Sequence, residues 1–183
     1  FGIAGGDVGG VLEEIKALEA KGFSFEAAEA SVALLMKRAE PDYRAPFELV
    51  DFLVNVQHRS GRGIFSEAMV KVKVGGELLH TAAEGDGPVD ALDAALRKAL
   101  VTRYPEVEEL HLVDYKVRIL DGASGTAATT RVLVDTQRGT RRWSTVGAST
   151  NIIEASWRAL VDAIEYGLTV AAEPEGPLQG RQP

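Results

Sequence analysis

The feature that most constrains the fold of this sequence is an internal repeat. Three short matches keep nearly the same spacing: LVDF at residues 49–52 with LVDY at 112–115, VKV at 70–72 with VLV at 132–134, and VDA at 89–91 with IEA at 153–155. A unit that occurs twice predicts two similar halves that pack on each other. The chain has 183 residues, which is too short for one parallel barrel of about 250 residues.

The hydrophobic periodicity assigns the same order of elements to each unit. Val70, Val72 and Val74 alternate with lysines, as strands buried on one face do. Helical spacing returns at 89–100 and again at 152–168. We predict an α+β fold of two pseudo-symmetric βββα repeats: strands over 47–57, 67–74 and 78–83 with a helix from Pro88, then strands over 111–120, 130–136 and 142–146 with a helix from Ile152.

Both predicted helices carry start signals. Pro88 follows Gly87, and proline suits the first turn because the amide hydrogen that it lacks would have no helical acceptor there. Asn151 is followed three residues later by Glu154, the spacing of a capping box. These signals place the start of each helix directly after a predicted strand.

A helical pair precedes the repeats. Apolar residues fall at helical spacing from 11 to 39, with a break at residues 22–24 where Ser24 is a suitable N-cap. Two helices cannot bury their apolar faces alone, so this pair must pack on a partner chain, on the rest of this chain or on a domain missing from it. We expect a helical linker over 1–44, a repeat domain over 45–170 with repeats at 45–103 and 109–170, and a flexible tail over 171–183.

The composition limits the classes of molecule that this protein can be expected to bind. A net charge of −7 and a pI near 5.1 disfavour nucleic acid and anionic membranes. We interpret the basic cluster of Arg138, Arg141 and Arg142 as a solvated turn. The absence of cysteine excludes disulfides and thiolate metal sites, and it fits a cytoplasmic location. The first residue is Phe1, which indicates a piece excised from a longer protein.

No catalytic or metal site is predicted. The three histidines, His58, His80 and His111, do not share the short spacing of metal ligands. The sequence has no Gly-x-Ser-x-Gly elbow, no phosphate-binding loop and no cysteine nucleophile. We therefore expect a chain without an active site or cofactor of its own.

Small residues gather at two connections of the second repeat, and they form the candidate ligand site. Glycine and alanine let backbone amides approach a ligand, and a helix N-terminus favours a carboxylate. A zwitterionic amino acid needs such amides, an acidic group for its ammonium and apolar walls. The alternative is that the glycines only permit tight turns. The candidate residues are Tyr115, Asp121, Gly122, Gly125, Thr126, Ala127, Ala128, Gly147 and Ser149.

Three segments of this chain carry a family resemblance. The run from 113 to 168, which includes LDGASGTAATTRVLVDTQRG and STNIIEASWRALVDAIEYGL, looks like the end of citramalate synthases in the α-isopropylmalate synthase family. Residues 47–100, with GDGPVDAL at 85–92, resemble the first repeat of the same regulatory domain. The segment 15–39 resembles the helical linker that follows the family's catalytic barrel.

The resemblance implies a regulatory domain that forms a homodimer and binds a branched-chain amino acid as feedback inhibitor. In the family an N-terminal barrel, which needs a divalent metal, condenses acetyl-CoA with a 2-oxo acid. The citramalate type uses pyruvate and is expected to respond to isoleucine; the isopropylmalate type uses ketoisovalerate and responds to leucine. The alternatives are a purely structural dimerisation domain and, less favoured because no catalytic set is found, a stand-alone enzyme.

Overall fold

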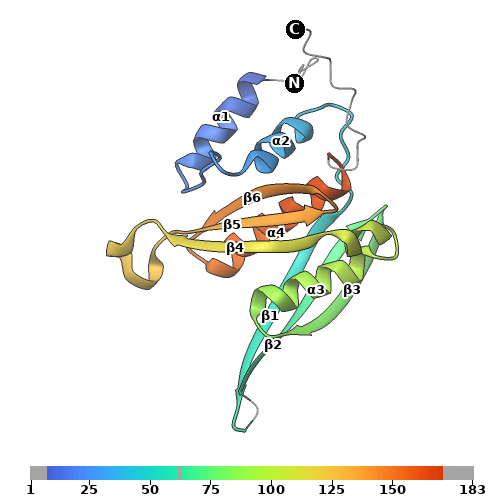
Figure 1. The fold of residues 1–183 in the computed structure, drawn as a ribbon, viewed down its shortest axis with the longest axis vertical. Helices are drawn as coiled ribbons and strands as arrows, with labels where there is room; N and C mark the ends of the chain where they lie inside the picture. Colours follow the sequence, from blue (N-terminus) through green and yellow to red (C-terminus); the bar gives the residue numbers. More distant parts are fainter. Residues whose placement is uncertain (1–7, 62, 171–183) are drawn as a thin grey trace.

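The computed structural model describes residues 8–61 and 63–170 (Figure 1). Two helices come first, and two similar units of three strands and one helix follow them. The elements are α1 (Val8–Glu19), α2 (Glu29–Arg38), β1 (Glu48–Arg59), β2 (Gly63–Val74), β3 (Glu77–Gly85), α3 (Pro88–Leu100), the 3-10 helix η1 (Pro105–Glu109), β4 (His111–Ile119), the 3-10 helix η2 (Gly122–Ala127), β5 (Thr130–Arg138), β6 (Arg141–Ser149) and α4 (Ile152–Leu168).

The predicted α+β fold with two βββα repeats is confirmed. Strands β1, β2 and β3 form one antiparallel sheet in that order, and β4, β5 and β6 form a second one. Each first strand has a register shift at the same place, between Leu49 and Asp51 in β1 and between Leu112 and Asp114 in β4. The predicted strands are present, most of them a few residues longer than predicted.

The two repeats also share a side-chain contact. The Thr81 hydroxyl donates to the Ala95 carbonyl oxygen of α3 at 2.7 Å, and the Thr145 hydroxyl donates to the Ala159 carbonyl oxygen of α4 at 2.7 Å. Both bonds tie the third strand of a repeat to the middle of its own helix. The repeat is therefore present in the three-dimensional structure as well as in the sequence.

Each helix covers the inner face of its own sheet, where the apolar residues alternate. Helix α3 packs on β2 and β3, and α4 packs on β5 and β6. Val70 and Val72 of β2 are fully buried together with Leu92 and Leu96 of α3. Burying one such side chain contributes about 1.5–3 kcal/mol, so these alternating positions account for much of the stability of each repeat.

The largest hydrophobic core belongs to both repeats together. The Trp157 ring of α4 lies 5.1 Å from the Phe52 ring of β1, measured between centroids. Leu160 and Ile164 of α4 are buried in the same cluster as Leu96 of α3. The two repeats are thus joined through α4 and β1.

The helical pair lies beside the β6 edge of the second sheet, where α2 contacts both β6 and α4 (Figure 1). Phe23 and Ala28 are buried there against Val146 and Ala148 of β6. The Phe23 and Phe25 rings stack with their centroids 6.0 Å apart. This contact explains why the segment between the two helices is ordered without being helical.

The predicted start of the second helix was wrong. Helix α2 begins at Glu29 after the N-cap Ala28, and Ser24 does not cap it. Phe25, which belonged to the helical pattern, and Phe23, which lies in the break, are held by their packing near the sheet. Tertiary packing therefore overrides a local capping signal here.

The predicted starts of α3 and α4 were right. Gly87 is the N-cap of α3, with Pro88 in the first turn. Asn151 caps α4, and its side-chain oxygen accepts from the amides of Ile153 at 2.9 Å and Glu154 at 3.4 Å. The Glu154 carboxylate does not return to Asn151. It accepts from the Ser149 hydroxyl at 2.7 Å, and the Ser149 oxygen accepts from the Asn151 amide at 3.1 Å.

The basic cluster flanks the exposed turn at 139–140 between β5 and β6, and two of its arginines form ion pairs at the surface. Arg138 pairs with Glu109 at 2.7 Å, and Arg142 pairs with Asp135 at 2.6 Å. The first pair connects the hairpin to η1, and the second joins β6 to β5 within the hairpin. The predicted flexible tail over 171–183 lies outside the described residues.

Candidate functional site

The predicted ligand loop lies at one end of the second sheet. It contains η2 and connects β4 to β5. Ile119 pairs with Thr130, and Thr130 pairs with Ser149, so the loop, the end of β6 and the first turn of α4 share that end (Figure 1). The structure therefore brings together the two small-residue connections that the sequence pointed to.

Within the loop, local interactions hold the backbone. Asp121 is the N-cap of η2, and its carboxylate accepts a hydrogen bond from the Ser124 hydroxyl. Gly125 has a φ of 57°, a backbone conformation that favours glycine. Gly122 and Thr126 belong to the same turn, Ala127 is exposed and Ala128 is buried. The glycine at 125 is thus needed for the turn, whether or not the loop binds a ligand.

Tyr115 and Gly147 lie further along the sheet and face α4. The Tyr115 hydroxyl is hydrogen-bonded to the Ser156 hydroxyl at 2.6 Å. A Cβ atom at Gly147 would overlap the Ala155 carbonyl oxygen and lie 2.9 Å from the Ala159 nitrogen. Gly147 therefore lets α4 approach the sheet closely. A role for these residues or for Ser149 in ligand binding stays a prediction.

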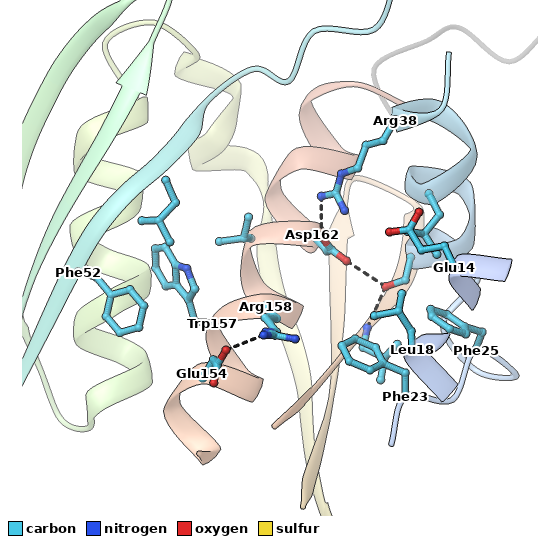
Figure 2. A pocket seen from close by; sticks show the side chains of 15 residues that line it. Glu14, Leu18, Phe23, Phe25, Arg38, Phe52, Glu154, Trp157, Arg158 and Asp162 are labelled. Atoms are coloured by element: carbon cyan, nitrogen blue, oxygen red, sulfur yellow. Dashed lines mark hydrogen bonds and ion pairs between the residues drawn. The ribbon is translucent and has the colours of Figure 1, made fainter. Parts of the chain in front are cut away.

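A second concave site lies between the helical pair, α4 and β1, and it has a volume of about 410 Å³. Figure 2 shows aromatic side chains on both of its sides: Phe23 and Phe25 on one, and Phe52 and Trp157 on the other. Charged side chains line the wall that α4 contributes. The lining residues are Glu14, Leu18, Phe23, Phe25, Ser31, Leu35, Arg38, Leu49, Phe52, Val146, Glu154, Trp157, Arg158, Val161 and Asp162.

An ion cluster next to this groove fastens α2 to α4. We call Arg38, Tyr43, Asp162 and Glu165 the Arg38 cluster. Arg38 donates from Nε and from one terminal nitrogen to the two oxygens of Glu165, at 2.9 and 2.7 Å. The same terminal nitrogen donates to Asp162 at 2.7 Å, and the Tyr43 hydroxyl donates to Glu165 at 2.7 Å. The bidentate geometry is that of a strong Arg–carboxylate pair.

Burial and charge shift the protonation equilibria of this cluster. Burial raises the pKa of Asp162, and the charge of Arg38 offsets only part of that rise. Burial also raises the pKa of Tyr43, which the hydrogen bond to Glu165 raises further. Burial would lower the pKa of Arg38, but its hydrogen bonds to Glu165 and the charge of Asp162 outweigh this and raise it. Arg38 is therefore the charged centre around which the cluster is built.

Ser31 adds a second connection near the cluster. Its hydroxyl lies 3.4 Å from an Asp162 oxygen, and it accepts a hydrogen bond from the backbone amide of Val146 at 3.0 Å. One α2 side chain therefore links β6 and α4. This geometry holds the helical pair firmly on the second repeat.

The sequence analysis missed the Arg38 cluster. Arg38 is separated from Asp162 and Glu165 by more than 120 residues, and charged residues on helices usually face solvent. The available signal was that Asp162 and Glu165 lie three residues apart in the mostly apolar second half of α4, so they share one face. That signal indicates two neighbouring acidic side chains on the buried side of the helix, but it does not indicate that Arg38 is the cation that pairs with them.

The described part of the chain contains no group of three or more His, Cys, Asp or Glu residues arranged to hold a metal ion. None of the helices in residues 8–61 and 63–170 is long and apolar enough to span a bilayer.

Comparison with known protein families gives a match over most of the chain. The family described as "LeuA allosteric (dimerisation) domain" matches residues 26–168. The chain belongs to this LeuA domain family. The match begins before α2 and ends with α4, so it includes α2, both repeats and the α2 and α4 walls of the groove.

The LeuA domain described here is similar to several curated proteins named (R)-citramalate synthase. It is 49% identical to that of Geobacter sulfurreducens over 91% of this chain and 32% of the relative, and 52% identical to that of Synechocystis sp. over 86% and 30%. A 2-isopropylmalate synthase of Yersinia pestis is 32% identical over 82% of this chain and 26% of the relative. The chain thus spans about a third of the length of these relatives.

Proposed function

We propose that this LeuA domain is the regulatory and dimerisation part of an acetyl-CoA-dependent citramalate synthase and that isoleucine is its feedback inhibitor. The observation that carries the proposal is the difference in identity. Relatives named (R)-citramalate synthase reach 49% and 52%, whereas a relative named 2-isopropylmalate synthase reaches 32% over a similar share of the chain.

The loop end of the second sheet supports amino-acid binding on physical grounds. Backbone amides of the loop around Gly122 and Gly125, and the first turn of α4, suit a carboxylate. Asp121 supplies a negative charge for the ammonium group, and Ile119, which is exposed, supplies an apolar wall. The full proposed contact set is Tyr115, Asp121, Gly122, Gly125, Thr126, Ala127, Ala128, Gly147 and Ser149.

Inhibition would act through a shift in population. A bound amino acid stabilises one packing of the regulatory domains, and coupling between two sites is typically about 1–3 kcal/mol. The helical pair precedes the repeats and is fastened to α4 by the Arg38 cluster. It therefore provides a stiff connection toward a catalytic barrel upstream, which is where the divalent metal of the parent enzyme would be held.

A leucine-responsive domain of a 2-isopropylmalate synthase is the second candidate, and the Yersinia relatives favour it. A purely structural dimerisation domain is the third. The family description names both allostery and dimerisation, so binding experiments are needed to separate the three.

The experiment is thermal unfolding of this chain with millimolar isoleucine, leucine, valine or alanine. A ligand that binds only the folded state adds about 2.7 kcal/mol at a hundred times its dissociation constant. A rise with isoleucine alone supports the proposal, and a rise with leucine alone moves the parent to the isopropylmalate type. If none of the four shifts the midpoint, the ligand proposal fails and dimerisation remains.

The variant Asp121→Ala tests the site. It should abolish the isoleucine-dependent shift and leave the ligand-free midpoint nearly unchanged, because Asp121 is exposed and bonds only locally. Asp51→Ala, which removes an exposed aspartate in the first repeat, is the matched control and should keep the shift.

A further inference from the structure

The groove between the helical pair, α4 and β1 takes no part in the function proposed above. Its volume of about 410 Å³ falls within the range of about 300–1,000 Å³ that small-molecule pockets occupy. Most of the side chains that line it are apolar, and a few charged side chains converge on it. This combination is typical of a binding site for a small organic molecule.

Aromatic rings stand on two opposite walls of the groove. Phe23 and Phe25 lie on the side of the helical pair, and Phe52 and Trp157 lie on the other side (Figure 2). Phe25 and Phe52 are only partly buried, so ring surface is open to a ligand on both sides. The faces of aromatic rings attract organic cations.

The two arginines that line the groove are already paired with carboxylates. Arg158 pairs with Glu154 at 2.6 Å. Arg38 pairs with Asp162 and with Glu165, each at 2.7 Å. An acid that entered the groove would have to displace one of these carboxylates or share its arginine. The groove is therefore poorly suited to a ligand that carries a carboxylate or a phosphate.

Glu14 is a groove carboxylate without a cation. It lines the groove from α1 and is exposed. It makes no hydrogen bond or ion pair with the other described residues, and no dashed line reaches it in Figure 2. A carboxylate beside aromatic rings suits an ammonium or guanidinium group carried on an apolar body.

We propose that this groove is a second ligand site of the chain and that it takes an organic cation. The ligand is a primary amine or guanidinium on an aromatic or branched aliphatic body, without an acidic group. Its charged end lies beside Glu14, and its apolar body lies between the two pairs of rings. This ligand class differs from the zwitterionic amino acid proposed for the loop end of the second sheet, so neither proposal depends on the other.

Helix α1 gives the site a wall that can adjust to a ligand. None of residues 9–19 is buried, and α1 packs mainly on α2. A molecule held between α1 and the first repeat adds contacts that α1 otherwise lacks. The amides of α1 should therefore exchange more slowly with solvent when the groove is occupied.

The test compares three compounds that share one apolar body and differ in charge: phenethylamine, phenethyl alcohol and hydrocinnamate. Phenethylamine should bind this chain with a dissociation constant of about 1 mM or lower, which is within reach of a ligand of this size. It should bind about fivefold more tightly than phenethyl alcohol, because one charge pair near water contributes roughly that factor. Hydrocinnamate should not bind measurably at about 10 mM.

Nuclear magnetic resonance locates the bound amine. The chain has two tryptophans. Trp157 lines the groove, whereas the Trp143 indole donates to the Ala163 carbonyl oxygen and is not part of the lining. Phenethylamine should shift the assigned indole N–H signal of Trp157 and leave that of Trp143 in place.

A pair of variants tests the role of Glu14. Glu14→Gln should weaken phenethylamine binding about fivefold and leave phenethyl alcohol binding unchanged, because only the charge is removed. Glu13→Gln is the matched control, since Glu13 is exposed on the same helix and is not among the lining residues. It should change the dissociation constant by less than about a factor of two. Circular dichroism checks that both variants are folded.

The outcomes separate the ligand class from the site. Equal binding of the three compounds, or tighter binding of hydrocinnamate, overturns the choice of an organic cation. An unshifted Trp157 signal with phenethylamine at about 10 mM overturns the site. Equal weakening by Glu14→Gln and Glu13→Gln assigns the attraction to the general negative charge of α1 and overturns the role of Glu14. None of these results bears on the isoleucine response, which Asp121→Ala tests at the loop end.

Discussion

Removing the guanidinium of Arg38 should loosen the helical pair from the second repeat. The variant Arg38→Ala leaves two carboxylates facing each other, Glu165 with a side chain that is 5% exposed and Asp162 with one that is 19% exposed. It also removes three charge-assisted contacts of 2.7–2.9 Å. Both effects act on the folded state and have no counterpart in the unfolded chain.

The expected loss follows from the burial of the partners. Removing one member of a buried ion pair typically costs about 3–5 kcal/mol, because the remaining charge is buried and unpaired. The Arg38 side chain is itself 36% exposed, so water can reach the site after the change, and we expect the lower end, about 3 kcal/mol. Arg38→Lys should lose less, since it keeps the charge but not the bidentate fork.

Hydrogen exchange of the α2 amides is the direct assay, with urea unfolding as the global one. If the segment opens separately, a loss of about 3 kcal/mol speeds exchange in α2 by roughly a hundredfold. Arg158→Ala is the control, because its pair with Glu154 is about half exposed on both sides and should contribute only about 0.3–0.5 kcal/mol. Equal effects of Arg38→Ala and Arg158→Ala would refute the reasoning.

Two further predictions concern α4. Gly147→Ala should destabilise the chain by about 2–3 kcal/mol in urea unfolding, because its Cβ would overlap the α4 backbone. Gly87→Ala meets nothing within 4 Å and should cost only about 0.5–1 kcal/mol, from the weaker N-cap of α3; equal losses would contradict the close approach. Burial raises the pKa of Asp162 above its usual 3.8, so the folded state holds that proton more tightly, and stability relative to Asp162→Asn should fall as pH rises from 3.8 through the raised pKa. The hydrogen bond from Ser149, with Arg158, lowers the pKa of Glu154, so stability relative to Glu154→Gln should instead be lost as pH falls below 4.5. Slopes of the same sign for the two variants would contradict this.

The elements of the repeats could be predicted because their signals are local. Alternating valines in β2 and capping residues such as Asn151 act over a few positions, and the duplicated pattern supplied each signal twice. The start of α2 could not be predicted in this way. Phe25 fits a helical period, but it packs with Phe23 beside β6 and Leu133 instead.

The candidate functional sites were also predicted only in part. The sequence brought attention to the loop at Asp121 and to Ser149, and the sheet register places both at one end. The groove and the Arg38 cluster were not predicted, because their walls come from α1, α2, β1 and α4. Only the packing of α2 against α4 shows that Asp162 and Glu165 have a shared cation.

The core that joins the repeats has a consequence for how this chain folds. Trp157 and Leu160 of the second repeat are buried in the same cluster as Val70 and Leu96 of the first. Each duplicated half, made alone, would expose an apolar surface that the other half normally hides. The repeats should therefore unfold in a single calorimetric transition whose van't Hoff and calorimetric enthalpies agree. Although the sequence carries one pattern twice, we expect that neither copy folds as an independent unit.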